Sequence, residues 1–368
     1  MHSIARVHPA SKHRLPLVAI SLALAVLFAL VATPASPADA VKVLDVEVHT
    51  NIAYQDPDPA GTQGNLLDLY IPDVRGKRKL PLLIWSSGSA WLSDGGKTVP
   101  ADIADFFNQE GYAVAGVSVR STSQVAFPGQ LHDIRAAIRW LREHAKEYDL
   151  DPKRFAIMGN SSGGWVAATA GTTSDIRRLP GETGVGRTSS AVQAAVPFFP
   201  PTDFLQMNAW YVEHPEVTSF INHDAPLSPL APPFSFPLAS PESLLVGCTD
   251  TAGNLLGIQS CPQETQRANP ISYVRGREVP MLILHGEADP LVPNGQSVLL
   301  YEALKRTRNN VTFISVAGAG HSVSQIINAP DYTVFTSRKG REKVGDRPAP
   351  TWENIEQFIH VALRSPGH

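Results

Sequence analysis

The chain has few cysteines and little net charge. Its 368 residues include two cysteines, and 31 basic against 34 acidic side chains give a formal net charge of −3. The one basic stretch, residues 338–343, is short and interrupted by a glycine and a glutamate. Proteins that follow a nucleic-acid backbone carry clustered basic side chains, so this composition indicates a solvated loop and no nucleic-acid partner. The sequence also lacks Cys-x-x-Cys and His-rich clusters, so we expect no metal site.

The first forty residues have the pattern of an export signal. Three basic residues precede the apolar run 15–32: Arg6, Lys12 and Arg14. The triplet Ala38–Ala40 fits a small-residue cleavage site. An apolar run of this length is also at the short limit for spanning a bilayer, so a retained membrane anchor is the alternative. The cleavage site favours removal after Ala40, which would leave a secreted or periplasmic protein without a stable membrane anchor.

The two cysteines, Cys248 and Cys261, lie 13 residues apart. An exported chain meets an oxidising compartment, so we expect them to form a disulfide. Two free buried thiols are the alternative. Nothing in the sequence indicates an oligomeric state.

Apolar runs alternate with helical patterns along most of the chain. The patterns predict strands at 41–49, 66–71, 80–85, 112–119, 154–158, 192–198, 281–285 and 311–316, the last of which would end the sheet. They predict helices at 101–109, 131–148, 163–170, 297–305 and 352–363. This alternation is typical of α/β proteins, in which helices cover both faces of a mostly parallel sheet and ligands bind at the carboxyl ends of its strands.

Residues 200–270 interrupt this alternation. The segment is rich in proline, has few periodic stretches and contains both cysteines. We interpret it as a cap or lid inserted after the strand 192–198. A long irregular surface loop that does not contact substrate is the alternative. Residues 329–350 form a second, shorter polar segment between predicted elements.

Residues Gly159–Gly163 read Gly-Asn-Ser-Ser-Gly, between an apolar strand pattern and a run of small residues. A G-x-S-x-G sequence on a sharp strand-to-helix turn exposes its central serine as a nucleophile, and the flanking glycines leave room for the turn. The motif therefore makes Ser161 the candidate nucleophile. Ser162 is adjacent but is not at the central position.

A serine hydroxyl near neutral pH needs a neighbouring base, and that base needs an orienting acid. With the nucleophile first, the expected chain order is serine, then acid, then histidine. Asp289 follows the strand 281–285 and a turn, and His321 follows the last predicted strand after a glycine-rich lead. The order Ser161, Asp289, His321 fits a catalytic triad.

Other acidic and histidine residues compete for these roles. Glu287 is next to Asp289, and Asp203 follows a different strand. His285 precedes the turn, which favours a structural histidine. His132 and Asp133 begin a long helix, where an acid favours the helix dipole and is expected to anchor a loop.

A tetrahedral intermediate also needs donors for its oxyanion. One donor is expected from the backbone N–H of the residue after the nucleophile, Ser162. The second is expected from the small-residue loop 86–91, where the N–H groups of Ser89 and Ala90 are the candidates.

These motifs resemble the α/β-hydrolase superfamily over residues 65–365, and more narrowly the secreted esterases near the bifunctional feruloyl and acetyl-xylan esterases. The matching stretches are Asp68-Leu69-Tyr70-Ile71-Pro72, Leu82-Leu83-Ile84-Trp85, Met158-Gly159-Asn160-Ser161-Ser162-Gly163-Gly164, and His285-Gly286-x-x-Asp289-x-x-Val292-Pro293. The resemblance implies an α/β-hydrolase domain over 41–368, with the cap inserted at about 200–270. This sequence departs from the group at the loop expected to supply the second oxyanion donor, the oxyanion loop, where Ser87-Gly88-Ser89-Ala90-Trp91 replaces the usual His-Gly-Gly-Gly-Trp. This leaves open whether a serine hydroxyl takes over part of that loop's role.

The sequence thus predicts an exported serine hydrolase of carboxylic esters that needs no cofactor and acts on small or polymer-linked esters. Two alternatives stay open. The same triad would serve an amidase or peptidase, although the large amino-terminal domain of prolyl-peptidase relatives is missing. A non-catalytic binding module on the same fold is the other, although such proteins typically lose a triad member.

Overall fold

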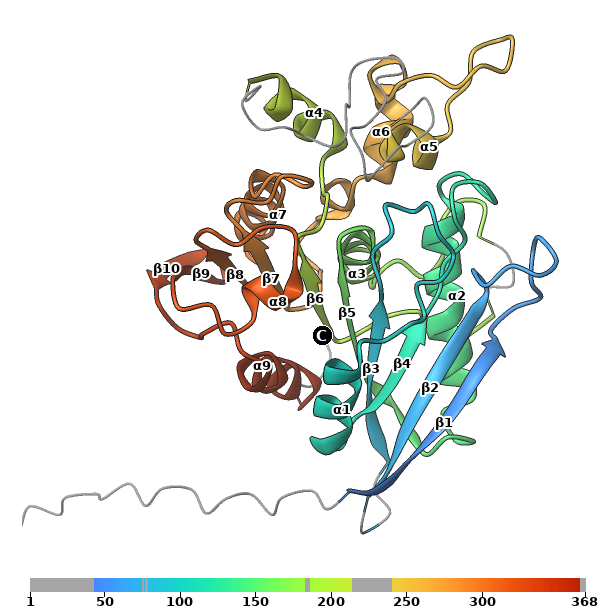
Figure 1. Cartoon of the computed structure of the whole chain (residues 1–368), viewed down its shortest axis with the longest axis vertical. Coiled ribbons are helices and arrows are strands. Elements are labelled where there is room, and N and C mark those ends of the chain that lie inside the picture. The colour runs from blue at the N-terminus through green and yellow to red at the C-terminus, as the bar shows by residue number, and fades with distance from the viewer. Residues whose placement is uncertain (1–42, 75, 77–78, 183–185, 214–239, 365–368) are drawn as a thin grey trace, which may run out of the picture. The chain divides into compact units, whose positions relative to one another are not determined.

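The computed structural model describes residues 43–74, 76, 79–182, 186–213 and 240–364, which belong to one compact unit (Figure 1). The predicted signal peptide, residues 1–40, lies outside these ranges, as do residues 214–239 of the predicted cap. None of the helices within the described ranges is long and apolar enough to cross a membrane.

Among the described residues, ten strands form one sheet in the order β1-β2-β4-β3-β5-β6-β7-β8-β9-β10 (Figure 1). The six strands from β4 to β8 are parallel, and the strands at both ends pair antiparallel. The predicted, mostly parallel sheet is therefore confirmed. The strands are β1 (Val43–Ala53), β2 (Leu66–Val74), β3 (Leu80–Ser86), β4 (Ala113–Val117), β5 (Leu150–Asn160), β6 (Ala194–Phe198), β7 (Met281–Gly286), β8 (Val311–Val316), β9 (Tyr332–Arg338) and β10 (Arg341–Gly345).

Helices cover both faces of this sheet. The helices of the described residues are α1 (Ala101–Gln109), α2 (Gly129–Glu143), α3 (Ser162–Thr172), α4 (Phe204–Glu213), α5 (Pro241–Val246), α6 (Pro262–Ala268), α7 (Gly295–Arg306), α8 (Val323–Ile326) and α9 (Trp352–Arg364), with 3₁₀ turns at Ile258–Ser260 and Pro270–Tyr273. Buried side chains of α2, α3 and α7 belong to one hydrophobic core, and those of α1, α8 and α9 belong to a second. All five predicted helices are present, one with the predicted ends and the others with ends displaced by up to five residues.

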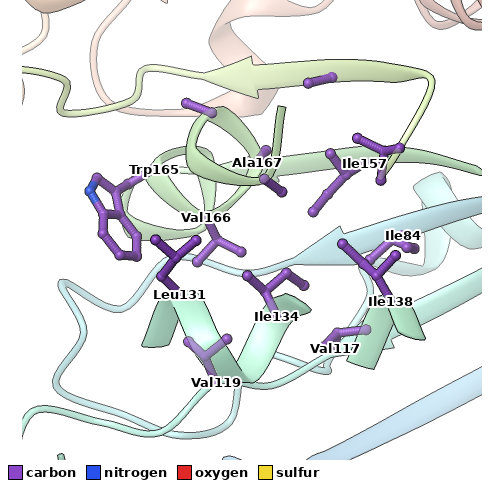
Figure 2. Close-up of a cluster of buried hydrophobic side chains, with 14 of the residues drawn as sticks. Ile84, Val117, Val119, Leu131, Ile134, Ile138, Ile157, Trp165, Val166 and Ala167 are labelled. Atoms are coloured by element: carbon purple, nitrogen blue, oxygen red, sulfur yellow. The ribbon is translucent and has the colours of Figure 1, made fainter. Parts of the chain in front are cut away.

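The alternation of side chains along each strand produces the two cores. In β3, Leu82 and Ile84 belong to the first core, whereas Leu83 and Trp85 belong to the second. Successive strand residues point to opposite faces, so a continuous apolar run fills both cores at once. Figure 2 shows the first core, where β3 and β5 side chains meet those of α2 and α3: Ile84, Leu131, Ile134, Ile138, Ile157, Trp165, Val166 and Ala167.

The segment 329–350 is more ordered than the sequence predicts. It contains the hairpin of β9 and β10, which extends the sheet beyond β8, so 311–316 is not the last strand. The two residues that join the strands, Lys339 and Gly340, have φ values of 52° and 80°, as the tight turns of two-residue hairpins require. The sequence shows no hydrophobic alternation over β10, because all five of its residues are exposed and three are charged.

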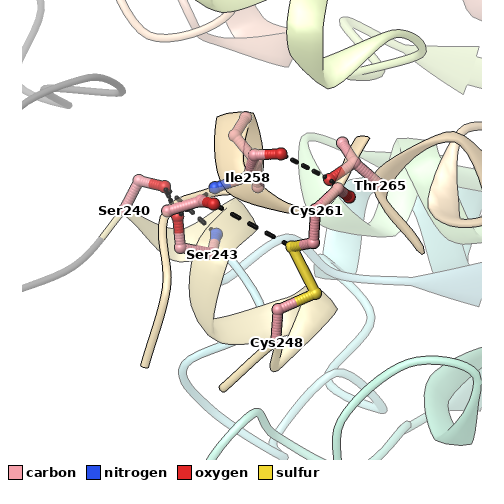
Figure 3. The surroundings of a disulfide bond; sticks show 7 residues. Ser240, Ser243, Cys248, Ile258, Cys261 and Thr265 are labelled. Atoms are coloured by element: carbon pink, nitrogen blue, oxygen red, sulfur yellow. Dashed lines mark hydrogen bonds between the residues drawn. A yellow bond between two sulfur atoms is a disulfide. The ribbon is translucent and has the colours of Figure 1, made fainter. Parts of the chain in front are cut away.

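The described part of the insertion contains α4, α5 and α6 and packs against the domain. Phe204 of α4 lies edge-on to Trp91, with ring centroids 5.7 Å apart, and the Trp165 indole donates to the Ala268 carbonyl at 2.8 Å. Cys248 and Cys261 form the predicted disulfide (Figure 3). The disulfide joins the chain that follows α5 to the start of α6, so it closes the irregular loop between these helices.

A buried ion cluster joins α2 to the chain that follows α3. The carboxylate of Glu182 accepts from Arg135 at 2.9 Å, from Arg139 at 2.7 Å and from the Leu179 N–H at 2.8 Å. The Arg135 and Glu182 side chains are each 1% exposed. Burial opposes ionisation of Glu182, but these hydrogen bonds outweigh it and lower its pKa from 4.5 to about 2.

Removal of the disulfide should destabilise the protein. Closing a loop of this length lowers the entropy of the unfolded chain and contributes about 3 kcal/mol. We therefore expect the double variant Cys248→Ser, Cys261→Ser to unfold at lower urea concentration than the parent under non-reducing conditions. A reducing agent should lower the parent's midpoint and leave the variant's unchanged. Equal midpoints for parent and variant would contradict the prediction.

Glu182→Gln should destabilise the protein most at neutral pH. Removing one partner of a buried ion cluster leaves uncompensated charge and costs about 3–5 kcal/mol. Because the folded pKa is lowered, this stabilisation is complete above pH 4.5 and is lost as pH falls toward 2. Urea unfolding of parent and variant should thus differ strongly at pH 7 and converge in acid. Glu143→Gln, at the exposed last position of α2, which also carries Arg135 and Arg139, is the matched control. A constant difference across this pH range would refute the assignment.

Candidate active site

Ser161 stands at the apex between β5 and α3, with φ 57° and ψ −125°. A non-glycine residue adopts positive φ only where the surrounding structure enforces it, and such strain gathers at functional sites. Here the Ser161 N–H donates to the Phe198 carbonyl at 3.0 Å, and its carbonyl accepts from the Trp165 N–H at 2.9 Å. The backbone of β6 and the first turn of α3 thus fix the serine.

The glycines around Ser161 are required by close backbone contacts. A Cβ atom on Gly163 would lie 1.9 Å from the Ser86 carbonyl oxygen, and one on Gly159 would lie 2.4 Å from the Gly163 oxygen. A Cβ atom on Gly164 would lie 2.4 Å from the Phe198 oxygen. No side chain fits at these distances, which explains the small residues of the motif.

The three residues predicted as a triad meet at the carboxyl ends of their strands. His321 Nε2 lies 2.9 Å from Ser161 Oγ, and His321 Nδ1 lies 2.7 Å from Asp289 Oδ2. Ser161 follows β5, Asp289 follows β7 and His321 follows β8. The Asp289 side chain is fully buried and that of His321 is 14% exposed. A serine, a histidine and a buried carboxylate are therefore linked by one chain of hydrogen bonds.

The carboxylate of Asp289 is held in its ionised form. Its Oδ1 accepts from the N–H groups of Leu291 and Val292 at 2.8 and 2.9 Å. Burial would raise its pKa, but the hydrogen bonds from His285 and His321 outweigh burial and hold the pKa well below the ordinary value. Asp289 is thus an anion that orients His321 without taking its proton.

His285 has the structural role predicted for it. It is fully buried, with Nε2 2.8 Å from the Val292 carbonyl oxygen and Nδ1 2.7 Å from Ser297 Oγ. A carbonyl can only accept, so Nε2 carries the proton, and Nδ1 accepts from the Ser297 hydroxyl. The same Nε2 lies 3.3 Å from Asp289 Oδ2, so His285 supports the loop that carries the acid.

The other acidic candidates are engaged elsewhere. Asp203 accepts from the backbone and side chain of Gln206 at the start of α4, and exposed Glu287 accepts from the Ser315 hydroxyl. Asp133 accepts from the Arg120 backbone and guanidinium, which confirms that it anchors the loop after β4. Arg120, His132 and Asp133 line a polar cavity of about 700 Å³ to which no triad residue contributes.

Phe199 was not predicted as part of the site. Its ring lies against the His321 imidazole, with centroids 4.3 Å apart, and its φ is 36°. The position directly after β6, followed by Pro200 and Pro201, is the one signal in the sequence that could have indicated it. Phe199 limits the space in which the imidazole can rotate.

Ser87 supports the loop where the sequence departs from His-Gly-Gly-Gly-Trp. Its hydroxyl accepts from the Trp85 indole at 2.8 Å and donates to the Thr98 carbonyl at 2.7 Å. Its N–H donates to the Gly96 carbonyl at 2.9 Å. These bonds hold the start of the loop after β3 in the absence of the histidine.

The predicted oxyanion donors differ in their hydrogen bonding. The Ser162 N–H begins α3 and so has no acceptor within the helix. The Ser89 N–H donates to Ser162 Oγ at 2.8 Å, so it already has an acceptor. For the Ala90 N–H, the described part of the chain contains no acceptor. Of the three predicted donors, the N–H groups of Ser162 and Ala90 are therefore the ones that have no acceptor among the residues described.

Within the described ranges, Cys248, Cys261 and Glu264 are the one group of His, Cys, Asp and Glu residues close enough to share a metal ion. Both sulfurs of this group are in the disulfide, which removes them as thiolate ligands.

The chain is similar to known esterases. The chain is 28% identical over 279 residues to the esterase LipQ of Mycobacterium tuberculosis. This match covers 74% of this chain and 58% of LipQ. The chain is 24% identical to the esterase LipC of the same organism, over 86% of this chain and 66% of LipC. The chain thus spans less than two thirds of the length of these curated relatives.

Solved structures share the fold. A truncated carbohydrate esterase from gut microbiota aligns with a TM-score of 0.64 and 25% identity, over 89% of this chain and 99% of that one. A bifunctional GH43-CE protein of Bacteroides eggerthii aligns with a TM-score of 0.60 and 29% identity, over 75% of this chain and 35% of that one.

Residues 67–304, which include Ser161 and Asp289, match the BD-FAE family. Ser161 and Asp289 follow strands of a sheet with the strand order of an α/β-hydrolase, and the relatives of this chain include esterases. This chain belongs to the BD-FAE family.

Proposed function

We propose that the protein is an exported serine hydrolase of carboxylic esters. The observation that carries the proposal is the hydrogen-bond chain from Ser161 through His321 to the buried Asp289. The triad arrangement serves acyl transfer on many folds, and the named relatives of this chain are esterases. The amino-terminal signal pattern supports export.

In the proposed reaction, Ser161 Oγ attacks the ester carbonyl while His321 Nε2 takes the hydroxyl proton. The imidazolium then carries a proton on both nitrogens, and the Asp289 anion 2.7 Å away stabilises it. His321 gives the proton to the leaving alcohol, which completes the acyl-enzyme. Water then attacks the acyl group with His321 again as base, and the acid is released with Ser161 restored.

The negative oxygen of each tetrahedral intermediate needs fixed donors. Of the three predicted oxyanion donors, the N–H groups of Ser162 and Ala90 have no acceptor among the described residues, whereas the Ser89 N–H donates to Ser162 Oγ. Because the charge on this oxygen develops only in the transition state, preorganised donors lower the barrier more than they tighten substrate binding.

Acylated carbohydrate is the substrate class that we propose. The solved structure that covers 89% of this chain is titled a carbohydrate esterase, and the second is a bifunctional GH43-CE protein. An exported enzyme would meet polymer-linked and small esters outside the cell.

Ser161→Ala should abolish ester hydrolysis and covalent labelling. Without the hydroxyl no acyl-enzyme forms, and kcat on p-nitrophenyl acetate and butyrate should fall at least about 10³-fold. A fluorophosphonate probe should label the parent at Ser161 and leave the variant unlabelled. Ser174→Ala, two residues beyond the carboxyl end of α3, is the control and should keep both ester hydrolysis and labelling. Turnover by Ser161→Ala within tenfold of the parent would sink the proposal.

Asp289→Asn should lower kcat by about 10³- to 10⁴-fold. The amide offers an N–H where His321 Nδ1–H needs an acceptor, so the imidazole takes the wrong tautomer. Asp203→Asn is the matched control, because Asp203 bonds to α4 and to Asn269. Steady-state kinetics on p-nitrophenyl butyrate test both variants. If the two changes reduced kcat equally, Asp289 would not be the orienting acid.

A further inference from the structure

The two variable positions of the G-x-S-x-G motif both contact the oxyanion loop. Asn160 Oδ1 accepts from the Gly88 N–H at 3.1 Å, and Ser162 Oγ accepts from the Ser89 N–H at 2.8 Å. The residues on either side of the nucleophile thus hold two consecutive N–H groups of the neighbouring loop.

The loop lies directly against the nucleophile turn. A Cβ atom on Gly88 would lie 2.4 Å from the Asn160 carbonyl oxygen and 2.6 Å from Ser161 Cβ. Ser162 is 4% exposed, and the cavity that it lines together with Ser89 and Trp91 measures only about 10 Å³. This is about the space of one water molecule, so little empty space separates the loop from the turn.

The backbone beyond Ser89 is strained and needs such anchors. Ala90 and Trp91 have φ values of 51° and 57°, a region that non-glycine residues rarely adopt. Trp91 is held by edge-on contacts with Trp165 and Phe204, with centroids 5.6 and 5.7 Å apart. The Ser162 hydroxyl holds Ser89, the residue directly before Ala90, whose N–H has no acceptor within the described ranges.

We infer that the Ser162 side chain is a positioning residue that holds Ser89, so that the Ala90 N–H serves as the second oxyanion donor. Ser162 then contributes twice, with its own N–H to the oxyanion and with its hydroxyl to the loop. This inference rests on the proposed function.

Ser162→Ala tests the inference because it removes the hydroxyl and keeps the backbone N–H. Loss of one well-placed oxyanion donor costs about 10²- to 10³-fold, and a displaced donor should cost less. We expect kcat on p-nitrophenyl butyrate to fall about tenfold or more, with KM within threefold. The inhibition constant of a phenylboronic acid, whose adduct with Ser161 resembles the tetrahedral intermediate, should rise in parallel.

The opposite result is also informative. If the Ser89 N–H is itself an oxyanion donor and Ser162 competes for it, then Ser162→Ala should leave kcat unchanged or raise it. A fall smaller than fivefold, or a change confined to KM, would overturn the inference. Failure of the proposed function would look different, because the parent itself would then hydrolyse no ester.

Two further variants separate positioning from stability. Ser174, two residues beyond the carboxyl end of α3, has a hydroxyl that accepts the backbone N–H of Val192 at 3.2 Å, and Ser174→Ala removes it. This variant should match Ser162→Ala in thermal stability and keep the parent's kcat. Ser162→Cys, with a sulfur that accepts weakly, should also lower kcat, and it carries the test if the alanine variant does not fold.

Discussion

The site depends on how closely two backbones approach at the ends of neighbouring parallel strands. The chain leaving β3 passes so near the turn after β5 that Gly163 has no space for a Cβ atom beside the Ser86 carbonyl. This contact brings Ser161, the proposed nucleophile, close to the loop 86–91 before any side chain is considered. A register shift between β3 and β5 would separate them, so the pairing of the two strands is part of the active site.

The buried charge of the site is satisfied before substrate arrives. Asp289 accepts from two backbone N–H groups and faces two imidazoles, and His285 is in turn fixed by the Ser297 hydroxyl. A carboxylate with so many donors keeps its charge and its orientation. The proton movements of the proposed mechanism are therefore confined to Ser161, His321 and the substrate.

Much of this arrangement could be predicted from the sequence. Chain order and strand ends were enough to select Ser161, Asp289 and His321, because parallel strands bring their carboxyl ends to one edge of the sheet. The β9–β10 hairpin was missed because its side chains are mostly polar and exposed, so hydrophobic alternation gave no signal. Phe199 and the bond between Ser162 and Ser89 were also beyond sequence reasoning, since both depend on side-chain directions across loops that are distant in sequence.

The β9–β10 hairpin forms one edge of the sheet. The sheet is open, and β10 pairs within the described residues only with β9, which leaves its outer backbone groups available to another strand. All five residues of β10 are exposed, and Arg341, Glu342 and Lys343 are charged. A strand from a second chain would have to desolvate these charges in order to pair there. The polar edge is therefore a barrier to aggregation through sheet extension, at a place where an apolar strand would have promoted it.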